Sequence, residues 1–357
     1  MVQFDRRAAF RVFGTAAAAV PAAAVAMPLL TACSDEKPKS EKPSGTPRID
    51  VHCHYLPDFY RDALLAAGLS KPDGIPRLPD WSESAALEAM DQLGVSKQYV
   101  SITSPGVDLT GDAAAARTLA RRVNEEGARL KTAHPDRFGF FASTPLPDVD
   151  GALTEITYAF DDLGASGVVL ETNFNGTYLG NETLEPVYAE LDRRKAVVFL
   201  HPTSPHSACG TLDTGLPYPN TMMEFLFDTT RTVANMALAG VSERYPNIQV
   251  IVPHGGAALS VLCSRIDGMG GRLTGKDKPL RKALQKMHFD LAGMPLPDQL
   301  PALLGIADPS RIHYGSDWPF TPLTEVRSNA EALDNAAQLA GDRLADVMRG
   351  NAQQLFA

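Results

Sequence analysis

The stretch Arg48-Ile-Asp-Val-His-Cys-His54 predicts a buried strand that ends in part of a metal site. Alternate side chains of a strand point to the same face, so His52 and His54 are expected to share a face with Asp50. The residues between them are expected to point the other way. Two imidazoles held in this way can bind zinc, iron, copper or nickel. The alternative is two ordinary histidines near the end of a strand.

Seven more short, mostly apolar runs follow this stretch and alternate with longer amphipathic segments. Runs that are apolar almost throughout are typical of parallel strands buried on both faces. We therefore expect a (β/α)₈ barrel over residues 48–357. An open doubly wound sheet is the alternative, although it more often has a glycine-rich turn after its first strand, which is missing here. The eight expected strands are 49–54, 98–103, 138–143, 167–172, 196–201, 248–254, 287–292 and 312–317.

The helical periodicity predicts the elements between these strands. Two connections are longer than packing requires, 55–82 and 202–224, and we expect both to form pocket walls at the C-terminal face of the barrel. Surface insertions or oligomer contacts are the alternative. The expected helices are 83–93, 113–133, 152–163, 186–194, 225–245, 258–269 and 296–304, with two more within 324–355.

Residues 1–33 are expected to form an export signal. The pair Arg6-Arg7 precedes an alanine-rich run and indicates twin-arginine export. The segment ends in Leu30-Thr-Ala-Cys33, which resembles a bacterial lipobox, so Cys33 is the expected lipidation site. Residues 34–47 read as a flexible linker. We expect a cell-envelope lipoprotein that touches the membrane only through this anchor, and a secreted or periplasmic protein otherwise.

The composition excludes several classes of protein. The chain has 357 residues, of which 44% are hydrophobic and 21% charged, as in globular proteins. The net charge is −9 and no basic run occurs, so no nucleic-acid partner is expected. Four cysteines are too few for a disulfide scaffold.

Five polar side chains stand where expected strands end. The C-terminal ends of all the strands of a barrel meet at one face, so these side chains can converge although they are far apart in the sequence. Three imidazoles and one carboxylate suit a single Zn²⁺ or Mn²⁺ with an open position for water or substrate. The five residues are His52, His54, His201, His254 and Asp317.

The motifs around these residues resemble the amidohydrolase superfamily. The resemblance is to the branch with aminocarboxymuconate-semialdehyde decarboxylase and the salicylate- and resorcylate-type decarboxylases, and within it most of all to the 6-methylsalicylate decarboxylases. It covers residues 48–357. The segments that carry it are Ile49-Asp-Val-His-Cys-His-Tyr-Leu-Pro57, Val198-Phe-Leu-His-Pro-Thr203, Pro253-His-Gly-Gly256 and Tyr314-Gly-Ser-Asp-Trp-Pro319.

The resemblance implies a role for each convergent residue. The implied metal ligands are His52, His54, His201 and Asp317, while His254 is a non-ligand histidine that faces the open coordination position. Binuclear relatives carry a lysine at the end of the fourth strand, where this chain has Glu171. We therefore expect one divalent metal, zinc first and manganese as the alternative. Participation of Glu171 in a second metal site is the less expected arrangement.

The implied activity is metal-dependent, non-oxidative decarboxylation of a phenolic, 6-methylsalicylate-like acid or a related unsaturated acid. Either His254 or Asp317 delivers the proton to the ring carbon. Arg231 and Trp318 are candidate substrate-binding residues, with a structural ion pair and a packing role as the alternatives. A homodimer is also expected, since relatives are often dimers.

Two other functions compete with this one. A hydrolase would use the same metal to activate water for attack on a lactone, ester or amide. A non-catalytic lipoprotein would only capture its substrate, although it would not need His254. Release of CO₂ without net addition of water distinguishes the decarboxylase from the hydrolase.

Overall fold

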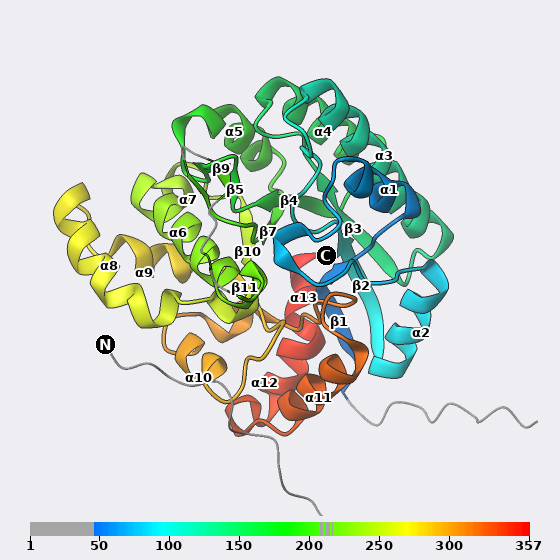
Figure 1. Cartoon of the computed structure of the whole chain (residues 1–357). Coiled ribbons are helices and arrows are strands. Elements are labelled where there is room, and N and C mark those ends of the chain that lie inside the picture. Colours follow the sequence, from blue (N-terminus) through cyan, green and yellow to red (C-terminus); the bar gives the residue numbers. More distant parts are fainter. Residues whose placement is uncertain (1–45, 208–209, 212–214, 216) are drawn as a thin grey trace, which may run out of the picture. The chain divides into compact units, whose positions relative to one another are not determined.

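The computed structural model describes residues 46–207, 210–211, 215 and 217–357. Its centre is an eight-stranded parallel sheet whose strands follow one another in chain order. Figure 1 shows these strands surrounded by the helices. The strands are β1 (Arg48–His54), β2 (Val95–Ser101), β3 (Phe138–Ser143), β4 (Gly167–Glu171), β7 (Val197–His201), β10 (Gln249–Val252), β11 (His288–Asp290) and β12 (Ile312–His313).

The first and last strands meet, which makes the sheet a nearly closed barrel. The Val51 amide donates to the carbonyl of Tyr314 at 3.1 Å, and the Asp317 amide donates to the carbonyl of His52 at 2.7 Å. A doubly wound sheet would leave these two edges apart. The barrel prediction is therefore confirmed. The last strand is shorter than expected because the segment after it soon leaves the extended conformation, with a φ of 58° at Asp317.

The helices cover the outside of the barrel. Two predicted helices, 83–93 and 113–133, have the predicted bounds, whereas the one expected over 225–245 is divided where Gly240 adopts a φ of 77°. Helices α1 and α9 were not predicted. The helices are α1 (Asp58–Ala66), α2 (Glu83–Leu93), α3 (Ala113–Ala133), α4 (Val149–Asp161), α5 (Glu185–Arg193), α6 (Glu224–Ala239), α7 (Val241–Arg244), α8 (Leu259–Thr274), α9 (Pro279–Leu284), α10 (Gln299–Leu303), α11 (Leu323–Asp334), α12 (Asp342–Ala345) and α13 (Asn351–Leu355).

Short elements occupy the connections. Two small hairpins follow β4 and β7, and single helical turns begin or end several loops. The hairpin strands are β5 (Asn173–Phe174), β6 (Thr177–Tyr178), β8 (His206–Ser207) and β9 (Gly210–Thr211). The turns are η1 (Pro72–Gly74), η2 (Glu182–Leu184), η3 (Asn220–Met222), η4 (His254–Gly256), η5 (Pro309–Arg311), η6 (Ala337–Leu339) and the π-helical η7 (Asp346–Gly350).

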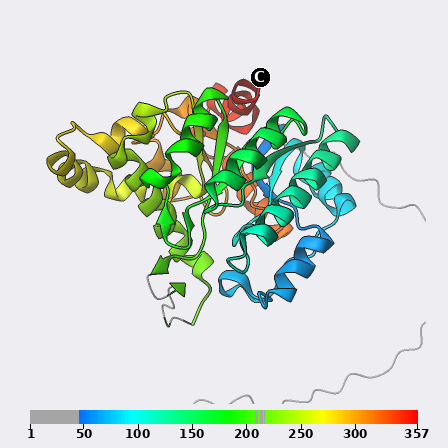
Figure 2. The same cartoon turned by 90° about the horizontal axis from the view of Figure 1, so that it is seen from above.

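One end of the barrel is closed by the C-terminus. A cluster of apolar side chains that includes Phe141 and Phe199 fills the interior, and Ala352 of α13 belongs to it. Phe356 stacks on Tyr99 of β2 with 3.7 Å between the ring centroids. In Figure 2 the C-terminal helix lies on the opposite side of the barrel from α1 and the β8–β9 hairpin. A site can therefore form at the C-terminal ends of the strands.

The predicted export signal, with its lipidation site Cys33, lies outside the described residues, as does most of the predicted linker. Within the described part of the chain, no helix has the length and apolar character needed to cross a bilayer.

Candidate metal centre

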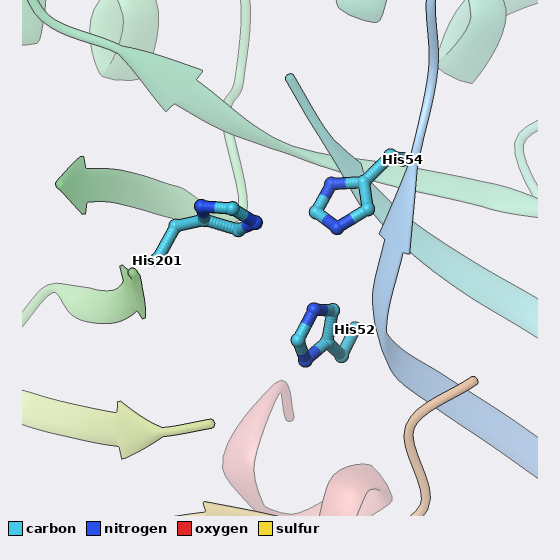
Figure 3. A group of neighbouring side chains, drawn as sticks. All are labelled: His52, His54 and His201. Atoms are coloured by element: carbon cyan, nitrogen blue, oxygen red, sulfur yellow. The ribbon is translucent and has the colours of Figure 1, made fainter. Parts of the chain in front are cut away.

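Four elements bring the five predicted site residues together at one end of the barrel. His52 and His54 are in β1, His201 ends β7, His254 lies in the turn after β10, and Asp317 follows β12. Metal-ligating atoms of the first three histidines lie within 4.8 Å of one another, and so do those of His52, His254 and Asp317. Figure 3 shows the three rings of the first group around a common space. The barrel thus assembles the predicted constellation.

A β-bulge in β1 aims the first two histidines. Asp50 pairs with Gln98 and Cys53 with Val100, so β1 has one residue more than β2 between these two pairs. Val51 belongs to the apolar cluster inside the barrel. The next residue, His52, also faces this cluster, because its ring centroid lies 4.8 Å from that of Phe199. The expectation that Val51 points away from His52 is therefore wrong, because the bulge interrupts the simple alternation of the strand.

Each of the three histidines is held by its Nδ1 atom. His52 Nδ1 lies 2.8 Å from Asp290 Oδ2. His54 Nδ1 lies 3.3 Å from the carbonyl oxygen of Ser101, and His201 Nδ1 lies 2.7 Å from that of Pro202. His54 Nδ1 also lies 3.2 Å from Ser101 Oγ, which can donate or accept. A carbonyl or a carboxylate oxygen only accepts, so in the neutral rings of His52 and His201 the proton sits on Nδ1 and Nε2 keeps its lone pair. This is the tautomer a metal-binding histidine requires.

Asp290 is a residue of the site that the sequence analysis missed. It ends β11, is fully buried, and accepts the amides of His254 and Ala292 through Oδ1, both at 3.0 Å. Its other oxygen holds His52. One carboxylate thus positions a candidate ligand and the backbone of the facing histidine. The signal that could have found it is an acidic residue near the end of the predicted strand 287–292.

The backbone around Asp317 and His254 is adapted to the site. Both residues have positive φ, 58° and 53°, which costs free energy for a residue other than glycine and is typical of functional sites. Gly315 allows the last segment to pass close to β1, because a Cβ atom there would lie 2.9 Å from His52 Cβ and 3.2 Å from Asp290 Cβ. The glycine before Asp317 is therefore a packing requirement.

Two of the three histidines are neutral in the metal-free site, whereas His52 must lose a proton to coordinate. Burial lowers the pKa of His54 and of His201, so both rings are neutral and ready to coordinate. Burial opposes the charged form of His52 as well, but Asp290 and Asp317 raise its pKa to about 10. Although burial raises the pKa of Asp317, the facing imidazoles of His254, His52 and His54 lower it well below its usual value.

The donor set fits a divalent cation. His52 Nε2 is buried, and its contact with Asp317 Oδ1, at 3.5 Å, is too long for a good hydrogen bond. His54 Nε2 faces Asp317 Oδ1 at 3.0 Å. In the metal-free site a proton between the two atoms accounts for this distance, and a cation can replace that proton. Three imidazole nitrogens and a carboxylate are the ligands that zinc and manganese take in proteins.

A cavity of about 430 Å³ adjoins this centre through Glu171, whose Oε2 lies 3.5 Å from His201 Nδ1, although none of the five site residues is among the residues that line it. Its walls come from the ends of β3 and β4 and from the two long connections that were predicted to form them. The connections are joined to each other, since Asp73 accepts the Ser204 amide at 3.2 Å and Asn220 Nδ2 donates to Ser204 Oγ at 2.8 Å. The predicted pocket walls are thus present, although residues 58–66 of the first connection form helix α1.

The remaining predicted residues lie in different places. Glu171 lines the cavity, and its Oε2 lies 3.5 Å from His201 Nδ1, outside the metal-binding groups of the described chain. His206 also lines the cavity. Among the described residues, the cavity walls include neither Arg231 nor Trp318. Arg231 is half-exposed beside Asp228 at 3.5 Å, and Trp318 is packed in the outer core, so their substrate contacts stay predictions.

Comparison with known proteins identifies a family and relatives that match this chain over the whole barrel. A family model described as an amidohydrolase matches residues 49–357. A 6-methylsalicylic acid decarboxylase of Aspergillus aculeatus is 37% identical over 320 residues, which cover 87% of this chain and 96% of that protein. A crystal structure described as an amidohydrolase II has a TM-score of 0.82 at 37% identity, covering 87% of this chain and 99% of its own.

A second solved structure shares the fold at lower identity. The 5-carboxyvanillate decarboxylase of Novosphingobium aromaticivorans, complexed with manganese, has a TM-score of 0.76 at 21% identity, covering 87% of this chain and 96% of its own. The family model covers the whole barrel of this chain. The chain therefore belongs to the amidohydrolase family, as its sequence motifs predicted.

Proposed function

We propose that the protein is a metal-dependent, non-oxidative decarboxylase of an aromatic acid with a hydroxyl group ortho to the carboxylate. The observation that carries this is the convergence of His52, His54, His201 and Asp317 beside a cavity large enough for one aromatic ring. The resemblance to the 6-methylsalicylic acid decarboxylase of Aspergillus aculeatus, at 37% identity, supports the same reaction class.

The proposed ligands are His52, His54 and His201 through Nε2, with Asp317 through a carboxylate oxygen. One metal is proposed, because Glu171 is not part of a metal-binding group among the described residues. A divalent cation held by these residues would supply a positive charge that stabilises the negative charge of the substrate. Zinc remains our first expectation and manganese the alternative, which is the metal of the solved 5-carboxyvanillate decarboxylase.

The chain's own groups orient the substrate and move the proton. The cavity holds the ring in one place beside the centre, which lowers the entropic cost of reaching the transition state. Decarboxylation requires a proton at the carbon that carries the carboxylate, and a positioned acid provides it. His254 Nε2 lies 4.0 Å from Asp317 Oδ2, and the proposed proton donor is either of these two residues.

The test of the function is a balanced measurement of products. Purified protein with one equivalent of zinc or of manganese is incubated with salicylate, its methylated and hydroxylated derivatives, and a set of lactones and esters. The proposal expects CO₂ and the matching phenol in equal amounts, with solvent deuterium on the ring carbon in D₂O. A hydrolase would instead open lactones with addition of water and release no CO₂.

Metal content gives an independent test of the site. Elemental analysis should find one equivalent of metal in the wild type and much less in His201→Ala and Asp317→Ala. Lys71→Ala, on the exposed rim of the cavity, should keep its metal. Two equivalents of metal would instead favour a binuclear site that includes Glu171.

We also propose that the protein is exported as a lipoprotein and that it forms a homodimer. Residues 1–33 support secretion with lipidation at Cys33, and mass spectrometry of the mature protein would detect a diacylated cysteine at its N-terminus. An unmodified, shorter N-terminus would indicate simple secretion. The expected homodimer can be tested by light scattering of the soluble barrel.

A further inference from the structure

A second cavity lies at the opposite end of the barrel from the metal centre. It has a volume of about 110 Å³ and lies between the strands and the helices outside them. Its walls include Gln249, which begins β10, and Arg311, which directly precedes β12, so it belongs to the N-terminal ends of these strands. The residues of the metal centre stand at the C-terminal ends. A ligand in this second cavity would therefore not touch the metal centre.

The walls of this second cavity are mainly apolar. Leu170, Val198 and Val250 come from the neighbouring strands β4, β7 and β10. Leu191 of α5 and Met236 of α6 come from the helices outside these strands. All five side chains are buried. Atoms that line an apolar void lack contacts on one side, so a molecule that fills the void gains dispersion energy and removes its own apolar surface from water.

The size of the second cavity limits its ligand to a compact apolar group. An apolar cavity of about 150 Å³ holds a benzene molecule, so one of about 110 Å³ suits a partly inserted ring or a short branched alkyl group. Two tyrosines in the walls have their hydroxyls engaged elsewhere. Tyr188 accepts the Gly180 amide at 2.7 Å, and Tyr245 donates to Glu185. Their rings therefore add apolar surface to the walls.

Two cations in the walls have no anionic partner. Lys286 is exposed, and no described residue forms an ion pair with its ammonium group. Arg311 is held through Nη1, which donates to the Lys286 carbonyl at 2.9 Å and lies 2.8 Å from His288 Nε2, but it too has no ion pair within the described chain. No carboxylate is among the described residues that line the cavity. In a chain with a net charge of −9, these two cations favour an anionic ligand group.

We propose that this second cavity binds a small monocarboxylic acid, whose compact apolar group enters the cavity and whose carboxylate stays beside Lys286 and Arg311. Described residues make hydrogen bonds only with Nη1 of Arg311, so its Nε and Nη2 atoms can donate to both oxygens of a carboxylate. A neutral molecule of the same shape leaves both cations unpaired. The inference goes beyond the proposed decarboxylase function and does not depend on it.

The test follows methionine methyl signals by NMR, because Met236 and Met287 line the second cavity whereas Met90 and Met348 are buried elsewhere. The zinc-loaded full chain, isotope-labelled at its methionine methyl groups, is titrated with benzoate and isovalerate and with the neutral benzyl and isoamyl alcohols. Met236→Leu and Met287→Leu assign the two signals. We expect both to shift saturably with the acids, with dissociation constants of about 1 mM or lower. The matching alcohols should bind about tenfold more weakly or worse.

Two variants separate the role of charge from that of the apolar walls. Lys286→Gln should weaken the acids about threefold or more and leave the alcohols unchanged. Its matched control is Lys282→Gln, which removes the same charge from a residue that pairs with Asp277 at 3.2 Å and does not line the cavity, so it should bind like the wild type. Ser242→Leu places a larger side chain on the wall and should weaken all four compounds. Thermal denaturation confirms that each variant is folded.

Three results would overturn the inference. The first is that the Met236 and Met287 signals do not shift saturably with either acid, even if other methionines report binding elsewhere. The second is that the alcohols bind as tightly as the acids. The third is that Lys286→Gln and Ser242→Leu bind the acids like the wild type. Release of CO₂ plays no part in this measurement, so a failure of the proposed decarboxylase function would leave its outcome unaffected.

Discussion

Replacing Asp290 by asparagine should prevent His52 from coordinating a metal, although all the proposed ligand residues are retained. Asp290 Oδ1 accepts two amides, from His254 and Ala292, and Oδ2 accepts the proton of His52 Nδ1. An asparagine has only one acceptor oxygen. It satisfies more donors by turning that oxygen to the two amides, which leaves its NH₂ group facing His52 Nδ1.

That arrangement reverses the tautomer of the ring. His52 Nδ1 must then accept a hydrogen bond, so the proton moves to Nε2 and the lone pair that faces the site is lost. Loss of such a supporting group costs about 10- to 100-fold in metal affinity, or about 1.4–2.7 kcal/mol. The assay is a competition titration of zinc and of manganese against a coloured chelator, for wild type and Asp290→Asn.

The control is Asp267→Asn. Asp267 is also a mostly buried aspartate whose Oδ1 accepts two backbone amides, from Leu280 at 2.9 Å and Arg281 at 3.2 Å, but it contacts no candidate ligand. This variant should bind metal like the wild type, whatever it loses in melting temperature. If Asp290→Asn binds metal as tightly as the wild type, the tautomer argument for the site is refuted.

Three further predictions concern the same centre. Gly315→Ala places a Cβ atom 2.9 Å from His52 Cβ, so it should lower the free energy of unfolding by about 1–3 kcal/mol and also lower metal affinity. The control is Gly268→Ala, because Gly268 lies in helix α8 with open space around it. Thermal denaturation should show no loss of stability for this control. Metal affinity should fall about tenfold for each pH unit below the His52 pKa of about 10, because the ring must lose its proton to bind; a pH-independent dissociation constant would contradict this. His254→Asn should keep its metal and lose about 100-fold or more in decarboxylation, whereas Asp317→Ala should lose both, so a metal-free His254→Asn would make that histidine a ligand.

Much of the architecture could be predicted because it follows from local patterns. Apolar runs bounded by polar residues indicated the eight strands, and the helices 83–93 and 113–133 have their predicted bounds because their apolar periodicity and end signals are strong. Helix α1 escaped prediction because its nine residues lie in a long connection rich in proline and glycine. The last predicted strand, 312–317, proved to be two residues long, because its end bends to position Asp317.

The candidate site was predictable only as a list of residues. The sequence by itself determined that His52, His54, His201, His254 and Asp317 stand at strand ends, and a barrel gathers strand ends at one face because its parallel strands share a direction. The gathering of these five residues at one face therefore depends only on the order and direction of the strands.

Only the tertiary structure decided how these side chains are aimed and what completes the site. The bulge in β1 and the hydrogen bond from His52 to Asp290 both depend on contacts between strands. Asp290 is 238 residues from His52 in the chain, and no local pattern signals such a contact. Local patterns act over a few residues, whereas the tautomer of a ring is set by whichever atom the folded chain places beside it.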